Sequence, residues 1–264
     1  IRVEPGVTIR QLWQYAMGDG WWPYVVPRTM AVSLGGAAAM NIHGKNNWKV
    51  GPIGDHIREF ELLLPSGELR RCSRSSHADL FHAAIGGFGM LGCFTTITLQ
   101  MKRVHSGLLE VEPLVLRNFE DTMGTFEEGG TTADYLVGWV DAFGRGRSIG
   151  RGVIHAARYL HEGEDPHPEW TLQPSSQELP TRILGLIPKD QTWRALRPFV
   201  NDRGMRLINL VKYVSSRVHP DGHAYRQSLA AFSFLLDYVP DWKLSYGRGG
   251  LIQYQSFVPA ERAR

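Results

Sequence analysis

Apolar residues recur at helical spacing near the start of the chain. Four of them share one face of a predicted helix: Ile9, Leu12, Trp13 and Ala16. Thr8 and Gln11 have the spacing of a capping box, in which two side chains satisfy backbone amides that have no partner within the first helical turn. Gly18 and Gly20 then end the predicted helix.

Further along, the pattern changes to the alternation typical of strands. Residues 57–64 predict a strand, residues 65–67 a turn and residues 68–72 a returning strand, so this region is expected to form a hairpin. In the second half, a helix and two strands are expected over residues 118–128, 135–143 and 153–160. Residues 161–180 predict a loop, and residues 183–213 show apolar turns around Trp193 and Phe199.

A glycine-rich segment joins a predicted helix over residues 78–85, capped by Ser75 or Ser76, to a predicted strand over residues 93–101. Its string GFGMLG has the spacing of the dinucleotide fingerprint. That fingerprint needs a strand before the glycines and a helix after them, so that the pyrophosphate lies on the helix N-terminus. The order here is reversed. We therefore reject a Rossmann site and expect residues 85–94 to form a wall of some other pocket.

The end of the chain predicts one more strand, over residues 251–258. Alternation places Gln253 and Gln255 on one face of it and Tyr254 on the other. The two glutamines either bind a polar substrate or face water, because a buried amide without a partner is costly. A strand so close to the last residue indicates that the chain is cut inside a domain.

Composition and charge exclude several classes of protein. The 264 residues are 43% hydrophobic and 21% charged, with a net charge of +3, which is too mild to indicate nucleic-acid binding. No apolar run is long enough to span a bilayer, and no signal peptide opens the chain. Cys72 and Cys93 predict buried thiols in a reducing compartment, so the cytoplasm is expected, with membrane association as the alternative for a lipid-linked substrate. The spacing of the histidines predicts no metal site.

The candidate chemistry is concentrated in residues 27–55. The run GGAAA at residues 35–39 has almost no side chains, so its backbone can approach a flat or phosphorylated ligand closely. A polar cluster follows it directly: Asn41, His43, Lys45 and Asn46. One interpretation is a smooth floor ringed by donors, as a large planar cofactor needs. The other is tight helix–strand packing followed by a solvated turn.

Four strings together resemble a known family: VEPGVTIRQL, the stretch from PRTMAVSLGGAAAMNIHGKN to VGPIGDH, DLFHAAIGGFGMLG, and GLIQYQSFVP. The chain resembles FAD-linked oxidases of the vanillyl-alcohol-oxidase/p-cresol-methylhydroxylase type. The resemblance implies an α+β fold with FAD held without a covalent bond. It implies an FAD-binding domain over residues 1–103 without its N-terminal phosphate loop. It also implies a C-terminally truncated substrate domain over residues 104–264, built on an antiparallel sheet with helices on one side.

The resemblance also assigns residues to roles. Flavin contacts fall on one stretch and one later position: Arg28, Thr29, Ser33, Leu34, Gly35, Gly36, Met40, Asn41, Ile42, His43 and Phe94. Catalytic roles fall on His43, Lys45 and Gln255, and substrate contacts on Lys45, Gln253 and Gln255. Two positions depart from the family pattern: Arg28 stands where a glycine is expected, and Ser233 where a tyrosine is expected.

The implied function is oxidation of a CH–OH group of a sugar or polyol, with a lipid-phosphate-linked pentose among the substrates that the resemblance suggests. Hydride transfer leaves negative charge on the flavin, which His43 or Lys45 can stabilise, and a base must accept the hydroxyl proton. The sequence leaves that base open. Alternatives are reduction of a carbon–carbon double bond on the same fold, or a non-catalytic module, which the missing phosphate loop motivates. A short-chain reductase is the partner that the resemblance implies.

Overall fold

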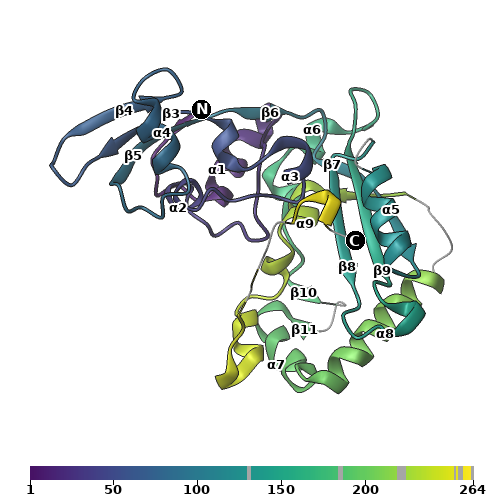
Figure 1. The fold of residues 1–264 in the computed structure, drawn as a ribbon. Helices are drawn as coiled ribbons and strands as arrows, with labels where there is room; N and C mark the ends of the chain where they lie inside the picture. The colour runs from purple at the N-terminus through teal and green to yellow at the C-terminus, as the bar shows by residue number, and fades with distance from the viewer. Residues whose placement is uncertain (130–131, 184–186, 219–223, 253, 255–257, 263–264) are drawn as a thin grey trace.

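The computed structural model of residues 1–264 describes the chain except residues 130–131, 184–186, 219–223, 253, 255–257 and 263–264. The described residues form an α+β fold with two four-stranded antiparallel sheets, one in each half of the chain. Figure 1 shows the first sheet at the upper left and the second at the right, with the chain crossing between them near α9. The predicted fold class is confirmed.

The first sheet contains the predicted hairpin. Its strand order is β1 (Arg2–Val3), β5 (Cys93–Leu99), β3 (Ile57–Leu63), β4 (Leu69–Ser73). The turn between β3 and β4 contains Gly67 at φ 85°, a left-handed conformation that favours glycine. A separate two-stranded pair joins β2 (Trp21–Pro23) to β6 (Met101–Arg103).

Four helices accompany the first sheet: α1 (Ile9–Ala16), α2 (Leu34–Ala39), α3 (Asn47–Val50) and α4 (Ala78–Ala84). The predicted capping box of α1 is confirmed, and its four predicted apolar residues are buried. The predicted serine cap of α4 is wrong. Ser75 and Ser76 donate their N–H groups to the Ser73 hydroxyl in a turn, so the chain enters α4 through His77 at φ 49°.

The glycine-rich segment lies between α4 and β5, in the helix–glycine–strand order that excludes a Rossmann site. Its backbone runs beside the end of α2. The Gly86 N–H donates to the Ala38 carbonyl at 3.0 Å, and the Phe88 N–H donates to the Ala39 carbonyl at 2.9 Å. The two segments without bulky side chains therefore lie side by side, although nearly fifty residues separate them.

The second sheet has the order β12 (Tyr225–Ser228), β7 (Leu108–Leu116), β9 (Gly152–Tyr159), β8 (Tyr135–Val140). Helices α5 (Phe119–Gly129) and α8 (Asp202–Val218) both contact β7 and β9, and Figure 1 shows both to the right of the sheet. The sequence predicted β8, β9 and α5. It missed β7, the long central strand, and α8, where only apolar turns were expected.

Short elements complete the second half: α6 (Pro168–Thr171), β10 (Arg182–Ile183), β11 (Ile187–Pro188), α7 (Thr192–Leu196) and α9 (Leu229–Ser233). The strand predicted over residues 251–258 is wrong for the residues described there: Leu251, Ile252, Tyr254 and Val258 lie outside any strand. Their side chains are exposed and no neighbouring strand pairs with them. Gln253 and Gln255 lie outside the described residues.

One hydrophobic core runs through both halves. Trp22 of β2 packs against Trp13 of α1 and against Phe234, which follows α9. The same cluster contains Val111 of β7 and Tyr135 of β8. The predicted division into two domains near residue 103 stays a prediction, because this cluster contains residues of both halves.

Further observations concern membrane-spanning helices, the two cysteines and metal ligands. No helix among the described residues is long and apolar enough to cross a membrane. Both cysteines are free, but the prediction that both are buried is wrong for Cys93, which begins β5 and is exposed. Burial raises the pKa of the Cys72 thiol. In the described part of the chain, no three His, Cys, Asp or Glu side chains are grouped closely enough to hold a metal ion.

Candidate functional site

A cavity of about 270 Å³ opens where the two halves of the chain meet. Its lining comes from two segments of the first half and one strand of the second: Val26, Pro27, Arg28, His43, Gly44, Lys45, Leu136, Val137 and Gly138. Three of the residues assigned to the site from sequence are therefore together in one cavity, namely Arg28, His43 and Lys45. The strand that faces them, β8, was predicted as a strand but was not predicted to belong to the site.

The β8 wall presents backbone rather than side chains. β8 is the last strand of its sheet, and the Leu136 N–H donates to the Lys45 carbonyl at 3.3 Å, away from β9. Backbone groups alternate in direction along an antiparallel strand, so the N–H and C=O of Gly138 also point away from β9. The space where a Gly138 side chain would lie is occupied by Phe126, at 3.0 Å from the position of a Cβ. This wall therefore offers a backbone donor and acceptor to a ligand.

Lys45 is the most perturbed cation of the cavity. Its Nζ donates to the Phe232 carbonyl and lies 4.7 Å from the centroid of the Phe232 ring. Burial and the neighbouring charge of Arg28 lower the pKa of Lys45 to about 7. A lysine with this pKa is unprotonated in a large share of molecules at neutral pH and can accept a proton.

The described residues that line the cavity include no carboxylate. Arg28 and Lys45 therefore meet in the cavity without an acidic side chain on its wall. His43 is exposed and its Nδ1 lies 3.5 Å from the Gly44 carbonyl oxygen. The donor set suits a ligand that carries or develops negative charge.

Residues after β12 form hydrogen bonds with the two segments that carry the cations of the cavity. The Asp237 carboxylate accepts from the Thr29 hydroxyl and from the Met30 N–H, both at 2.8 Å, and the Leu236 N–H donates to the Arg28 carbonyl at 3.1 Å. The Phe232 carbonyl holds Lys45. Residues 232–237 thus position the cavity's cations from the other half of the chain.

Other residues assigned to flavin contact lie outside the cavity lining. Ser33 caps α2 by accepting from the Gly36 N–H, and Asn41, at φ 43°, accepts from the Gly54 N–H at 3.0 Å. Met40 and Gly36 are exposed at the surface of α2. Phe94 packs edge-on against Phe60 within the first sheet. These positions line a path along α2 and the sheet rather than one pocket.

The run of small residues serves packing at several of its positions. A Cβ on Gly35 would come within 2.8 Å of the Pro5 side chain, and Leu34, Ala37 and Ala38 are buried in the core. Gly36 is different, because a Cβ there would meet only the Ser33 hydroxyl. Both interpretations of the run therefore hold in part: tight packing inward, and a bare backbone surface outward.

Sequence reasoning missed several residues that shape the site. Asp237 and Phe232 were not identified because their contacts span roughly two hundred positions. His155 lies on β9 directly opposite Val137, and its Nδ1 has no hydrogen-bond partner among the described residues. Burial, followed by the charges of Lys212 and Lys45, lowers the pKa of His155, so its imidazole is neutral beside the cavity wall. The only indication of the position of His155 in the sequence was the alternation of side chains along β9.

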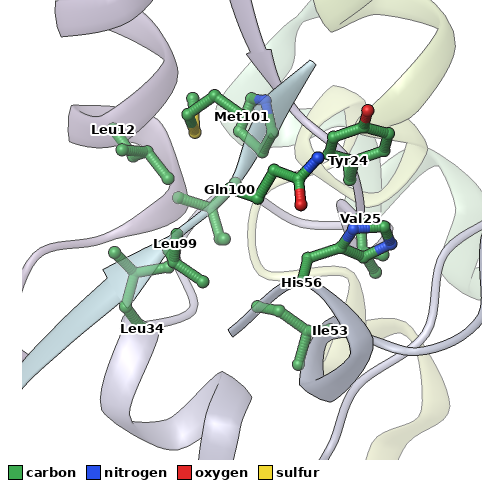
Figure 2. A pocket seen from close by; sticks show the side chains of 11 residues that line it. Leu12, Tyr24, Val25, Leu34, Ile53, His56, Leu99, Gln100 and Met101 are labelled. Carbon is green, nitrogen blue, oxygen red and sulfur yellow. The ribbon is translucent and has the colours of Figure 1, made fainter. Parts of the chain in front are cut away.

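A second hollow in the first half is too small to be a site. Figure 2 shows Tyr24, His56 and Gln100 on one side of it and Leu12, Leu34 and Leu99 on the other. Its volume is about 10 Å³, room for a single water at most. The Tyr24 and His56 rings stack in parallel at 4.2 Å. This hollow is a gap in the core.

The fold and the cavity are compatible with a bound flavin. The cavity's cations match the negative charge that a flavin ring acquires on reduction, and the exposed backbone at Gly36 permits close approach of a flat ligand. Residues 1–73 match the family model described as the FAD binding domain. The chain therefore carries an FAD-binding domain, and FAD is its cofactor.

Three curated relatives show the range of proteins that the chain resembles. Decaprenylphosphoryl-beta-D-ribose oxidase of Mycolicibacterium smegmatis is 28% identical over 99% of this chain and 55% of its own length. L-gulonolactone oxidase 5 of Arabidopsis thaliana is 27% identical over 55% of this chain and 25% of its own length. Human Delta(24)-sterol reductase is 32% identical over 35% of this chain and 18% of its own length. The chain spans about half of the first relative and less of the others.

Proposed function

We propose that the protein oxidises a CH–OH group of a sugar or polyol, and that the substrate occupies the cavity between residues 26–28, residues 43–45 and β8. The observation that carries this proposal is the position of Lys45, a buried amine with a pKa of about 7 in a cavity whose described lining holds no carboxylate. Alcohol oxidation by hydride transfer needs such a proton acceptor at neutral pH.

Each lining residue has a distinct part in the reaction. Lys45 accepts the hydroxyl proton on its lone pair while one of its N–H groups still donates to the Phe232 carbonyl. The carbon-bound hydrogen leaves as hydride, so the C–O single bond becomes a carbonyl; FAD, when bound, supplies the two-electron acceptor. Arg28 and His43 stabilise the negative charge that results. Gln255 and Gln253, outside the described residues, remain predicted catalytic and substrate contacts.

The open edge of β8 supports a hydroxyl-rich substrate. A sugar hydroxyl both donates and accepts hydrogen bonds, and the Gly138 backbone offers one acceptor and one donor on the cavity wall. The printed name of the Mycolicibacterium relative supports a lipid-phosphate-linked pentose as the particular substrate. A short-chain reductase that reduces the resulting ketone is the proposed partner. The two free cysteines support the cytoplasm as the proposed compartment.

The similarity to human Delta(24)-sterol reductase supports a second candidate, reduction of a carbon–carbon double bond. The two reactions differ in what they require from the cavity. Double-bond reduction of a sterol-like substrate needs a mainly apolar cavity, whereas the described lining places Arg28, His43 and Lys45 beside four apolar side chains. That difference favours alcohol oxidation.

The experiment is anaerobic stopped-flow reduction of the purified flavoprotein, followed by the loss of visible flavin absorbance. Pentoses, hexoses and polyols are tested as donors, and an enone is tested with the reduced protein. We expect bleaching by at least one polyol or sugar and no reoxidation by the enone. Reoxidation by the enone without bleaching by any alcohol would establish the double-bond reductase.

A spectrum taken before and after acid precipitation separates the remaining alternatives. Flavin released into the supernatant is the expected result for a non-covalent cofactor. A colourless protein that does not bind added FAD would identify a non-catalytic module.

The variant His43→Gln is matched to the stopped-flow experiment and keeps a polar side chain beside Lys45. We expect slower bleaching with an unchanged pH dependence, because Lys45 still accepts the proton.

A further inference from the structure

Helix α8 (Asp202–Val218) has its apolar stripe on the outside. Four large apolar side chains are about half exposed: Leu207 (51%), Leu210 (47%), Val211 (58%) and Val214 (46%). Their spacing of three, four and seven residues places them on one face of the helix. A helix that packs on a sheet normally turns such a face inward.

The inner face of α8 is held by polar groups instead. The Asn209 side chain is buried and donates to the Asp141 carboxylate at 2.8 Å. The buried Tyr213 ring lies under the Arg151 guanidinium at 5.1 Å. The helix is therefore anchored to the end of β8 and β9 in a fixed orientation, and its outward leucines and valines are a property of the native fold rather than of fraying.

Positive charge is concentrated in α8 and in the segment before it, although Lys212 lies over the Trp139 ring and Arg217 over the Tyr213 ring. Residues 191–218 contain six basic residues and one acidic residue, a net charge of +5, whereas the whole chain carries +3. The remainder of the chain is thus net negative. Arg203 lies four residues before Leu207 and Arg217 three residues after Val214, so both extend the apolar stripe at its ends. Figure 1 shows α8 at the rim of the molecule, remote from the first sheet.

We propose that this outer face of α8 docks on an anionic lipid bilayer, with the helix lying flat in the interface. Leu207, Leu210, Val211 and Val214 enter the acyl boundary while the flanking arginines reach the anionic headgroups. An anionic bilayer surface has an apolar acyl layer directly below its negatively charged headgroups. The outer face of α8 matches both layers, because its apolar side chains lie between arginines. Seventeen residues span about 25 Å, too short to cross a bilayer but suited to lie on one.

This inference does not depend on the proposed oxidation. The outer face of α8 contributes no residue to the cavity lining, and docking is measured without turnover. A lipid-linked substrate would be one reason for such docking, but a neutral sugar substrate would leave the prediction unchanged.

The test is co-sedimentation of the full-length flavoprotein with two kinds of vesicle, one of phosphatidylcholine alone and one that also contains about 30% phosphatidylglycerol. We expect binding to the anionic vesicles, weakened by salt. Replacing one arginine, as in Arg203→Gln or Arg217→Gln, should lower the partition coefficient about fivefold. Leu210→Ser should lower it roughly fivefold to tenfold. The matched control is Leu69→Ser on β4, where the leucine is 54% exposed, and it should bind as the parent does.

Three outcomes would overturn the proposal. Equal binding to neutral vesicles would remove the role of charge. Absence of vesicle binding, together with a doubled mass in solution that Leu210→Ser abolishes, would make the face an interface between two copies. Absence of both would leave α8 without a docking role. Circular dichroism of each variant, which should match the parent, ensures that a loss of binding is not a loss of folding.

Discussion

Two ionisable side chains beside strand β8, Lys45 and Asp141, differ in whether they have partners of opposite charge in the described part of the chain. At the cavity, Lys45 is buried against Phe232 with the cation Arg28 nearby and no carboxylate among the described lining residues. Just beyond the end of β8, Asp141 is buried with a complete set of partners. Its carboxylate accepts from Arg151, Asn209 and the Phe143 N–H.

The difference separates structural from functional charge. A buried ion whose partners are all present is stable in place and leaves nothing for a ligand. A buried cation beside a second cation is unfavourable until the cation loses its proton or an anion arrives. Burial raises the pKa of Asp141, but the hydrogen bonds from its partners outweigh burial and lower it, whereas burial and charge both lower the pKa of Lys45. We propose Lys45 as the functional group because its pKa is strongly lowered and no acidic side chain is among the described residues that line the cavity.

Removing Lys45 should therefore impair the reaction without harming the fold. In Lys45→Met we expect the rate of flavin bleaching by substrate to fall by roughly 10²–10⁴-fold, the contribution of a positioned base. The melting temperature at pH 7 should not fall, because the folded state no longer holds a buried amine. Single-turnover kinetics and calorimetry on the same preparation provide the two measurements.

The control is Lys45→Arg, which keeps the positive charge but cannot lose a proton near neutral pH. It should be as slow as Lys45→Met if the amine acts as a base. A near-parental rate would mean that Lys45 acts only through its charge.

The free energy of unfolding should also depend on pH. The folded pKa of Lys45, about 7, lies below the unfolded value of 10.5, so the parent gains stability as pH rises from 7 through 10.5. The Met variant should lack that rise.

Removing the charge of Asp141 should do the reverse. Asp141→Asn leaves the Arg151 guanidinium without its buried partner, and we expect a loss of about 3–5 kcal/mol in the free energy of unfolding. The rate of bleaching by substrate, measured below the melting temperature, should stay within about twofold, because Asp141 does not line the cavity. Denaturant unfolding at pH 7 measures the loss.

The matched control for Asp141→Asn is Asp121→Asn, which removes a carboxylate from its surface pair with Arg117 and should cost much less than Asp141→Asn. The pH dependence sharpens the comparison. The folded pKa of Asp141 is lowered, so its contribution is complete above the unfolded pKa of about 4 and is lost as pH falls through the folded value. Equal costs for the two substitutions at pH 7 would contradict the structural role of Asp141.

The sequence predicted those parts of the molecule whose determinants are local. Thr8 and Gln11 cap α1 as expected, because a capping box involves only four consecutive residues. The β3–β4 hairpin follows from its turn, and the order of α4, glycines and β5 was enough to exclude a Rossmann site. The segment of His43 and Lys45 was found for the same reason, since its residue types are adjacent in the chain.

The parts that were missed depend on distant residues or on broken local rules. β7 contains Pro113, which argues against a central strand. The structure accommodates it because β12 pairs only with residues 108–111, so no described strand flanks that side of Pro113. The apolar stripe of α8 has helical spacing, but its inward residues are Asn209 and Tyr213, so the pattern did not resemble a helix that packs on a sheet.

The wall of the cavity could not be predicted for a geometric reason. The strand β8 was predicted, but which edge of it stays open depends on the order of strands in the sheet, which no local pattern encodes. The backbone groups of Gly138, the Phe232 carbonyl and the Asp237 carboxylate reach the site only through that arrangement. The sequence therefore indicated candidate residues of the site, but it did not indicate the residues that form the opposite wall of the cavity.

The smallest expected effect concerns Arg28, the residue that stands where the family pattern has glycine. In Arg28→Gly the neighbouring positive charge is removed, so the pKa of Lys45 should rise and the acid limb of the pH–rate profile should move to higher pH. The shift should be smaller than the full distance from 7 to 10.5, because burial, the larger cause, remains. Arg28→Lys keeps the charge and should keep the profile. A profile that stays in place in Arg28→Gly would show that the two cations do not communicate, and the contrast between Lys45 and Asp141 would then rest on burial alone.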